Sequence, residues 1–362
     1  MEQWGLPDLP HEVVYNILSR LPVKSLCRFK SISKPWLTLI TDPHFVKSYL
    51  HQSMKSNTNH KLIVAPHYNW AQSSSQSSYS MDYQAPDPTL AELEMPWKSG
   101  VVEICGSFNG VLLLDIAYAL GYDSINDDFK VVGFVTRTAA RDVLSMPPFI
   151  SDGPCTVHVF SSKLSSWKSI GDFDYPCCLC GPGSVLNGAP HWFAHGITDT
   201  GECCFRIVCF DVMEEKFKDV PTPIYEVESN LFKVGVLDGC LCAVDIRRPK
   251  SHFDVWMMKE YGVKESWTKL FVVPNVPGVL FYKYCALLCF TKDGGVVLRL
   301  ELEASRPIKR KKSEESLKLA IYNPKQKTKR IRMPQDWMGF DVALYVESLV
   351  SPPRCNSTRR HC

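Results

Sequence analysis

The sequence has none of the segments that place a chain in or across a membrane. It contains no uninterrupted apolar run of about 18 residues, the length that a membrane-spanning helix needs. It also has no N-terminal stretch with the charged and then apolar order of a secretion signal. Charge of one sign is scarce as well, because the formal net charge is only +3 over 362 residues. This balance disfavours a protein bound all over to nucleic acid. We therefore expect a cytoplasmic protein, a nuclear protein or one found in both compartments, with no membrane partner.

The motifs of common hydrolases and nucleotide-binding enzymes are also missing. No G-x-S-x-G nucleophile elbow, no G-x-x-x-x-G-K-[ST] phosphate loop and no H-E-x-x-H zinc motif is present. The 15 cysteines, in a chain without a secretion signal, are interpreted as reduced thiols, mostly small core residues. Cys203, Cys204, Cys240 and Cys242 fit strand positions in this interpretation. We predict no catalytic residue, no cofactor and a chain that is not an enzyme.

One pattern of cysteines and histidines resembles the sequence motif of a zinc site. Cys177 and Cys180 are followed by His191 and His195, almost as in a Cys₂His₂ motif. The central gap of ten residues contains three glycines and two prolines, which exclude a finger helix. A turn at residues 187–188 also makes residues 191–195 a strand, in which positions four apart are separated by about 13 Å. We therefore predict no metal site.

The first 50 residues carry the period of helices. Val14, Ile17, Leu18 and Leu21 recur at i, i+3, i+4 and i+7 and are predicted to form one apolar stripe. Prolines at positions 22, 35 and 43 divide the stretch into four short helices, with Asp8 as the predicted first N-cap. Four helices in about 45 residues are too few to bury this apolar surface alone. The spare surface predicts a helix-packing partner.

The run LPDLPHEVVYNILSRLPVKSLCRFKSISKPW resembles the plant F-box along nearly its whole length. The resemblance implies docking onto a Skp-type adaptor, and through it onto the cullin and RING subunits of an SCF ubiquitin ligase. It also implies that some of the motif's apolar residues face the adaptor while the rest hold the bundle together. The positions that match the motif are Leu9, Pro10, Val14, Ile17, Leu18, Leu21, Pro22, Leu26 and Phe29. The alternative is a plain helical bundle folded against its own C-terminal domain.

The chain then changes character. Residues 51–99 are predicted to be a linker, with a Ser/Gln-rich loop over residues 72–80 and one strand at Leu62–Val64. From residue 100 to residue 352 the pattern switches to short strands, and residues 353–362 are predicted to be a disordered tail. The N-terminal domain is taken as residues 1–50. The fold class is therefore α+β multidomain, with a small helical bundle followed by a mostly-β domain.

Two units recur within the β domain. Apolar runs flank Asn-Gly or Asp-Gly turns at residues 109–110, 187–188, 238–239 and 293–294, and such dipeptides favour tight hairpins. Between them, bulky residues flank polar turns in the pairs Tyr122/Phe129, Phe160/Trp167, Phe210/Phe217, Trp256/Trp267 and Tyr322/Lys329. The last three glycine turns lie 51 and 55 residues apart. A period near 50 residues with about four strands per repeat is typical of β-propeller blades. A β-sandwich is the alternative architecture.

Segments such as GSFNGVLLL, VFSSKLSSWKSI, IVCFDVMEEKFKDVP and DVWMMKEYGVKESWTKLF resemble the plant F-box-associated, kelch-like interaction domain. The resemblance covers nearly all of residues 100–352 and implies a domain that holds a client protein for ubiquitination. One departure stands out. Between Leu114 and Gly121 the family carries an extra strand and a Pro-rich loop, whereas only residues 115–120 remain here. The first repeat is therefore predicted to lack a strand pair.

Together these features predict the substrate receptor of an SCF-type ligase, with an unidentified client protein. The alternative is a binding module for a small molecule or glycan, with an exposed aromatic such as Trp192 stacking on a ring. A basic segment, residues 306–332, carries eleven Lys/Arg and two Glu. Lys309–Lys312 fits a nuclear localisation signal, an acidic partner's docking site or a solvated loop between two strands. Only one aromatic is interleaved with these basic residues, which disfavours nucleic-acid binding.

Overall fold

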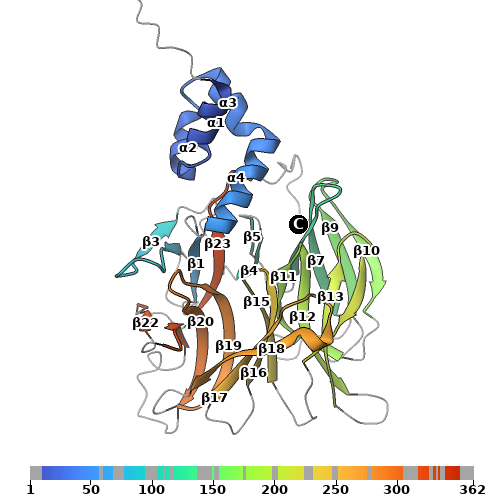
Figure 1. The fold of residues 1–362 in the computed structure, drawn as a ribbon. Coiled ribbons are helices and arrows are strands. Elements are labelled where there is room, and N and C mark those ends of the chain that lie inside the picture. Colours follow the sequence, from blue (N-terminus) through green and yellow to red (C-terminus); the bar gives the residue numbers. More distant parts are fainter. Residues whose placement is uncertain are drawn as a thin grey trace, which may run out of the picture. The chain divides into compact units, whose positions relative to one another are not determined.

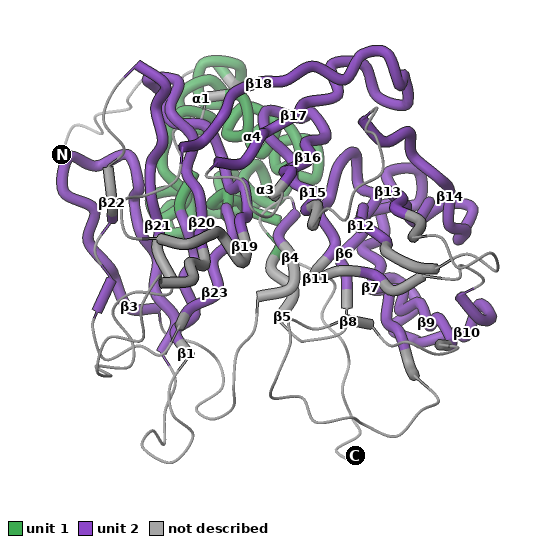
Figure 2. The backbone as a smooth tube through the Cα atoms, turned by 90° about the horizontal axis from the view of Figure 1, so that it is seen from below, with its two compact units in different colours: residues 1–61, 109–111, 345–351 green, residues 62–108, 112–344, 352–362 purple. Residues whose placement is uncertain are grey.

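A computed structural model gives the structure of this chain (Figure 1). It describes residues 10–56, 60–67, 77–93, 104–108, 111–114, 118–136, 149–150, 155–173, 177–197, 203–223, 231–246, 252–274, 279–304, 317–325, 329–331, 333–334 and 339–350. The chain divides into two compact units, coloured separately in Figure 2. The first contains residues 1–61, 109–111 and 345–351, and the second contains residues 62–108, 112–344 and 352–362.

The first unit contains four short helices at the predicted places. They are α1 (His11–Leu18), α2 (Val23–Phe29), α3 (Lys34–Thr41) and α4 (Pro43–Ser56). Pro10 and Pro22 stand at the N-caps of α1 and α2, since a proline has no N–H to leave unsatisfied there. The side chain of Ser33 caps α3 by accepting from the Trp36 N–H at 3.3 Å. Asp8, the predicted first N-cap, lies outside the described residues.

The second unit is a β-propeller with five blades, as the repeat period predicts. Blade 1 has the strand order β23 (Gly339–Val346), β1 (His60–His67), β2 (Ser78–Met81), β3 (Leu90–Leu93). Blade 2 has the order β10 (Ser166–Asp172), β9 (Cys155–Ser161), β7 (Asp128–Thr136), β6 (Tyr118–Asp123). Blade 3 has the order β14 (Lys216–Val220), β13 (Cys203–Asp211), β12 (Ala189–Ile197), β11 (Cys177–Leu186), β8 (Phe149–Ile150).

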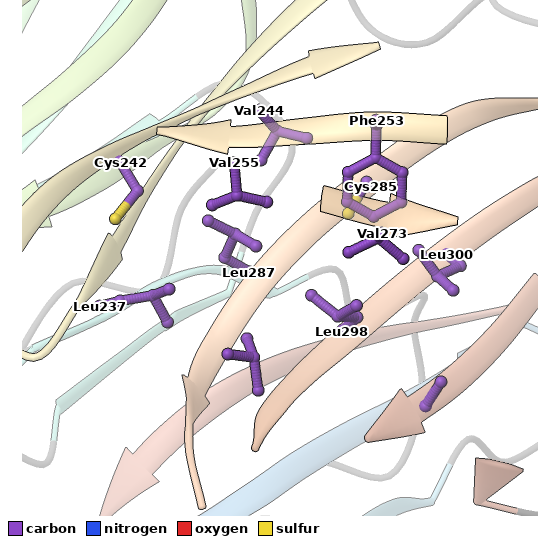
Figure 3. Close-up of a cluster of buried hydrophobic side chains, with 12 residues drawn as sticks. Leu237, Cys242, Val244, Phe253, Val255, Val273, Cys285, Leu287, Leu298 and Leu300 are labelled. Atoms are coloured by element: carbon purple, nitrogen blue, oxygen red, sulfur yellow. The ribbon is translucent and has the colours of Figure 1, made fainter. Parts of the chain in front are cut away.

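The last two blades have four strands each. Blade 4 has the order β15 (Leu231–Leu237), β16 (Cys240–Ile246), β17 (His252–Met258), β18 (Trp267–Pro274), with a short 3₁₀ helix η1 (Lys264–Ser266) before β18. Blade 5 has the order β19 (Val279–Phe290), β20 (Val296–Ala304), β21 (Leu317–Tyr322), β22 (Lys329–Ile331). Neighbouring blades share apolar cores. Figure 3 shows Phe253 and Val255 of blade 4 beside Cys285, Leu287 and Leu298 of blade 5.

A sixth, short sheet contains only β4 (Ile104–Phe108) and β5 (Val111–Leu114). It corresponds to the first repeat, and three residues separate the end of β5 at Leu114 from the start of β6 of blade 2 at Tyr118. In the described residues it has two strands where the blades have four or five. This agrees with the predicted loss of a strand pair between Leu114 and Gly121.

Two of the glycine-containing dipeptides form the tight hairpins that the sequence predicts, and residues 109–110 lie outside the described residues. Asn187 and Gly188 have φ values of 52° and 81°, and Asp238 and Gly239 have φ values of 50° and 70°, as a type I′ turn requires. Gly188 also approaches blade 2 closely, because its carbonyl accepts from the Tyr122 N–H at 2.7 Å. A Cβ at this position would lie 2.4 Å from the Tyr122 carbonyl oxygen, so only glycine fits.

Most of the predicted aromatic pairs lie directly opposite one another on neighbouring strands. Tyr122 pairs with Phe129, Phe160 with Trp167 and Phe210 with Phe217. The later pairs are displaced. In blade 4 Trp267 lies opposite Met258, and Trp256 lies opposite Lys269. In blade 5 Lys329 lies opposite Ile321, one residue before the predicted partner.

The segment predicted as a linker contains three strands of blade 1. Leu62–Val64 is a strand, as predicted, but β2 and β3 fall inside the interval assigned to the linker, and α4 continues to Ser56. These two strands have four residues each, and β3 is only partly buried, so neither shows the long apolar alternation that marks a strand in sequence. Residues 68–76 of the Ser/Gln-rich tract lie outside the described residues.

A buried lysine joins blades 2 and 3. Lys130 on β7 donates to the Val212 carbonyl at 2.6 Å and to Glu215 at 3.0 Å, and its ammonium lies 3.7 Å from Asp123. Glu215 also accepts from Lys168 at 2.6 Å. Burial opposes ionisation of Glu215, but the hydrogen bonds from Lys168 and Lys130 outweigh it and lower the pKa of Glu215. The carboxylate therefore holds lysines of two strands of blade 2 against the turn of blade 3.

We expect Glu215→Gln to lower the free energy of unfolding by about 1 to 2 kcal/mol at neutral pH. Since the folded pKa is depressed, the stabilisation is present above the unfolded pKa of about 4.3 and is lost as pH falls through the folded value. The difference between wild type and variant in urea unfolding should therefore shrink at pH 3. Glu214→Gln is the matched control, because the Glu214 side chain is exposed and its carboxylate accepts from Lys218 of the same hairpin. If both variants lowered the free energy of unfolding equally, the contact of Glu215 with blade 2 would contribute nothing to stability.

Candidate functional site

The helical unit has a small core that its own residues fill. Leu18, Leu26, Ile40, Phe45 and Tyr49 are buried at its centre. Tyr15 packs edge-on against Phe45 with ring centroids 5.1 Å apart, and Phe29 meets Trp36 in the same way at 5.1 Å. The Tyr49 hydroxyl donates to the Leu21 carbonyl at 2.8 Å. The bundle is therefore closed around this core by residues of all four helices.

A second set of apolar side chains points out of the bundle. Ile17 is 49% exposed and Ile32 is 61% exposed, although both are large aliphatic residues. Val13 and Leu37 are exposed to a similar degree, and Pro10 and Pro22 are exposed too. Monomeric proteins rarely leave so many large apolar side chains exposed on so small a unit, and such surfaces commonly contact another protein. These six residues are called the apolar face.

The structure sorts the nine residues that the sequence analysis predicted for adaptor binding. Pro10, Ile17 and Pro22 belong to the apolar face. Leu18 and Leu26 are buried in the core, which Val14, Leu21 and Phe29 border from partly buried positions. Leu9 lies outside the described residues. Among the described members of this set, Pro10, Ile17 and Pro22 are the exposed ones, and Leu18 and Leu26 hold the helices in place from the core.

The single apolar stripe predicted for α1 is wrong in one respect. Val14, Leu18 and Leu21 face the core, but Ile17 points outward together with Val13, four residues earlier. Residues four apart share a face of a helix, so α1 carries two apolar stripes. The second stripe is visible in the sequence as Val13 and Ile17, four residues apart. The prediction of a single stripe placed Ile17 with the residues that face the core. Ile32 and Leu37 were also missed, because Ile32 falls between α2 and α3, and Leu37 adjoins the residues of α3 that face the core.

The helical unit is rich in basic residues. Residues 10–56 contain seven Lys/Arg and two acidic residues. Arg20, Lys24, Arg28 and Lys34 are exposed. A protein that covers this unit is therefore expected to present an acidic surface around an apolar centre.

The structure describes the side chain of His191, one of the two histidines in the pattern that resembles a zinc site. His191 is buried on β12, with Nδ1 2.8 Å from the Ala189 carbonyl and Nε2 2.7 Å from the Tyr261 hydroxyl. Burial lowers the pKa of His191 to about 4, so the ring is neutral at physiological pH. Both ring nitrogens are occupied by these bonds. Cys177 and Cys180 lie on the neighbouring strand, β11, opposite Gly196 and Phe193.

The aromatic residue suggested for stacking on a small molecule is not exposed. Trp192 is only 2% exposed and lies in the core between blades 2 and 3. It packs edge-on against Phe134 with ring centroids 5.7 Å apart. The expectation of an exposed Trp192 is therefore wrong, because alternation along β12 turns this side chain toward blade 2.

Comparison with known protein families identifies both parts of the chain. The model of the F-box domain matches residues 6–48, and the model of the F-box associated beta propeller domain matches residues 114–352. The chain belongs to the F-box proteins with an associated β-propeller domain. The match to the F-box covers all four helices up to Ser48, and the match to the propeller begins at the end of β5.

Several Arabidopsis thaliana proteins are similar to this F-box protein over most of their length. F-box protein CPR1 is 32% identical over 353 residues, covering 83% of this chain and 81% of the relative. F-box protein At4g22390 is 28% identical over 343 residues, with 81% of each chain covered. F-box/kelch-repeat protein At3g23880 is 24% identical over 392 residues, covering 97% of this chain and 98% of the relative.

Membership of the family carries a coarse functional meaning. F-box proteins are typically non-catalytic adaptor subunits, and an F-box implies a Skp-type adaptor as partner. In the part of the chain that the structure describes, no helix is long and apolar enough to cross a membrane. Within the same residues no group of three or more His, Cys, Asp or Glu side chains is arranged to hold a metal ion.

Proposed function

We propose that this F-box protein is the substrate-recognition subunit of an SCF-type ubiquitin ligase. The helical unit binds the Skp-type adaptor, and the propeller binds a client protein for ubiquitination and degradation. The observation that carries the proposal is the apolar face, because it remains exposed after the bundle has filled its own core. Val13, Ile17, Ile32 and Leu37 do not contribute to the core of the bundle, so their exposure is explained by contact with another protein.

The proposed mechanism is positioning. The propeller holds the client while the adaptor joins the cullin and RING subunits, so that a client lysine stays near the charged ubiquitin carrier. Holding two reactants together replaces a collision in solution by an encounter at high effective concentration. None of the transferred atoms passes through this chain, which agrees with the absence of enzyme motifs in its sequence.

The first experiment is co-expression of the full chain with a Skp-type adaptor and purification through a tag on the chain. We expect the two proteins to elute together in a stable complex. Adding the cullin and RING subunits, the carrier enzyme and a client should then give ubiquitin transfer that requires this chain. A client is found by affinity purification from plant tissue with the proteasome inhibited, followed by mass spectrometry. A chain that elutes without the adaptor would refute the proposal.

Association with the adaptor should depend on salt. Because the helical unit carries seven basic and two acidic residues, long-range attraction to an acidic partner is expected to speed the encounter. Raising NaCl from 50 mM to 500 mM should slow association roughly tenfold, since screening shortens the reach of these charges. Dissociation, which depends on the apolar face, should change little. Surface plasmon resonance separates the two rates, and an association rate independent of salt would contradict the charge argument.

A further inference from the structure

A segment near the C-terminus contributes to the core of the helical unit. Leu349 packs against the buried cluster at the centre of the four helices, although the last of these helices, α4, ends at Ser56. Of the described residues that form or border this cluster, Leu349 is the one that lies outside residues 10–56. Residues 345–351 also belong to the first compact unit. Residues 347–350 are called the strap.

The strap continues β23 without a break, since β23 ends at Val346. Along β23 every second residue from Phe340 to Leu344 packs in the core shared by blades 1 and 5. Phe340 is buried there, and Val342 and Leu344 are partly buried. The next leucine along the chain, Leu349, packs in the core of the helical unit. One short stretch of chain therefore supplies apolar side chains to both cores.

Two polar contacts fix the path of the strap. The Lys61 ammonium donates to the Glu347 carboxylate at 2.5 Å. The Val350 N–H donates to the Ser348 hydroxyl at 3.2 Å, so the backbone turns at Leu349. The side chains of Lys61 and Glu347 are 30% and 21% exposed, and an ion pair of that exposure stabilises little. The apolar contact of Leu349 is therefore expected to contribute most of the stabilisation that the strap provides.

The helical unit is small enough for one such contact to matter. Its described core has five buried side chains, and a module of about 45 residues is marginally stable alone. The apolar face keeps its shape only while α1, α2 and α3 stay packed on this core. Leu349 borders the core and is not part of the apolar face, so its expected effect on adaptor binding is to hold the helices in place.

We propose that the strap is a fifth element of the adaptor-binding unit, and that Leu349 is a positioning residue for adaptor binding. The proposal rests on the proposed function and adds a condition to it. Because the strap follows β23, a chain that contains the strap also contains every strand of the propeller that the structure describes. Recruitment of the ligase is therefore conditional on a chain translated through residue 350, and a receptor cut short within the propeller recruits no ligase.

Substitution of Leu349 in the full chain tests the positioning role. Leu349→Asp places a carboxylate against the apolar core and should weaken binding of a purified Skp-type adaptor at least about tenfold, as measured by surface plasmon resonance. Leu349→Met keeps the apolar volume and should bind within about twofold of wild type. Asn356→Asp is the charge-matched control, because it adds the same charge in the predicted tail, and it should also bind within about twofold.

The association and dissociation rates distinguish positioning from direct contact. If Leu349 holds the helices, Leu349→Asp lowers the fraction of chains in the binding-competent arrangement, so the association rate should fall while the dissociation rate stays within about twofold. Ile17→Asp, which removes a contact with the adaptor, should instead speed dissociation. If Leu349→Asp dissociates at least about tenfold faster and associates as wild type does, Leu349 contacts the adaptor directly, and the positioning role is overturned.

Two stop codons test the condition on chain completion. A chain ending at Val346 keeps β23 and lacks the strap, whereas a chain ending at Pro352 keeps the strap and lacks only the predicted tail. The first should bind the adaptor at least about tenfold more weakly than wild type, and the second should bind as wild type does. Equal affinities of these two chains, or wild-type affinity of Leu349→Asp, would overturn the proposal.

Hydrogen exchange on the free chain separates this proposal from the proposed function. Leu349→Asp should speed amide exchange in α1–α4 and leave exchange in β12 of blade 3 unchanged. Unchanged exchange in the helices, or equal acceleration in the helices and β12, would overturn the proposal. A wild-type chain that binds no adaptor would refute the proposed function, and faster exchange in α1–α4 of Leu349→Asp would then still assign the strap to the helical unit.

Discussion

Ile17→Asp is expected to weaken binding of the Skp-type adaptor by at least about 100-fold, a loss of about 3 kcal/mol. Ile17 lies on α1 with half of its surface exposed, so the variant removes no core contact. The loss arises in the complex, where an apolar partner surface would enclose a carboxylate without a counter-charge. Interface residues that become fully desolvated commonly have effects of this size. Isothermal titration calorimetry with purified adaptor measures the change.

The control separates loss of binding from loss of folding. Gln52→Asp adds the same charge at an exposed position of α4 and should bind the adaptor within about twofold of wild type, since surface substitutions usually change little. Ile17→Asp should retain the helical circular dichroism signal, because its intrinsic cost in a helix is below about 0.7 kcal/mol. Leu18→Ala, by contrast, should lose adaptor binding together with the fold of the bundle. Undiminished binding by Ile17→Asp would mean that the apolar face contacts something other than the adaptor.

The same variant should convert the receptor from a protein that destroys its client into one that protects it. A chain with Ile17→Asp is expected to hold the client through the propeller but to recruit no ligase, so the client's half-life in plant cells should lengthen several-fold. We prefer this variant to deletion of residues 1–50, because Leu349 near the C-terminus packs against the helical core and would lose its cover. A cycloheximide chase after expression of each variant measures the half-life.

A control variant shows whether the change in client half-life comes from loss of adaptor binding. Gln52→Asp should shorten the client's half-life as wild type does. If Ile17→Asp supports the same ubiquitin transfer as wild type in a reconstituted assay, then the chain does not act through an adaptor. If Ile17→Asp stabilises the client and Gln52→Asp does not, the result would support adaptor binding by the helical unit and client binding by the propeller.

The parts of the fold that the sequence predicts well are those with local causes. Pro22 and Pro43 end or begin helices because proline cannot donate within a helix, and the boundaries of the four helices follow. Asn187-Gly188 and Asp238-Gly239 specify hairpins because both dipeptides accept positive φ angles. These features depend on a few neighbouring residues, so periodicity and turn chemistry were sufficient to predict a propeller of four-stranded repeats.

The features that the sequence analysis missed have non-local causes. Trp192 is buried because blade 2 packs on its side of β12, and nothing in its neighbours along the chain indicates which face of the strand is covered. Ile17 and Leu18 are adjacent aliphatic residues, but Ile17 is exposed and Leu18 is buried. This difference depends on where the other helices pack. Site residues are therefore harder to predict than elements, because exposure is a property of the assembled unit.

Blade 1 combines strands from both ends of the chain, with β23 lying beside β1. About 270 residues separate these two strands, so at roughly 5 to 20 residues per second a ribosome makes β1 on the order of 15 to 50 seconds before β23. During that interval β1 has no partner on the edge that β23 later occupies, and an unpaired edge invites pairing with other chains. Blade 1 is thus completed only when translation ends. A premature stop codon before Gly339 would leave four blades formed and the first one open, giving a product that chaperones and proteases recognise.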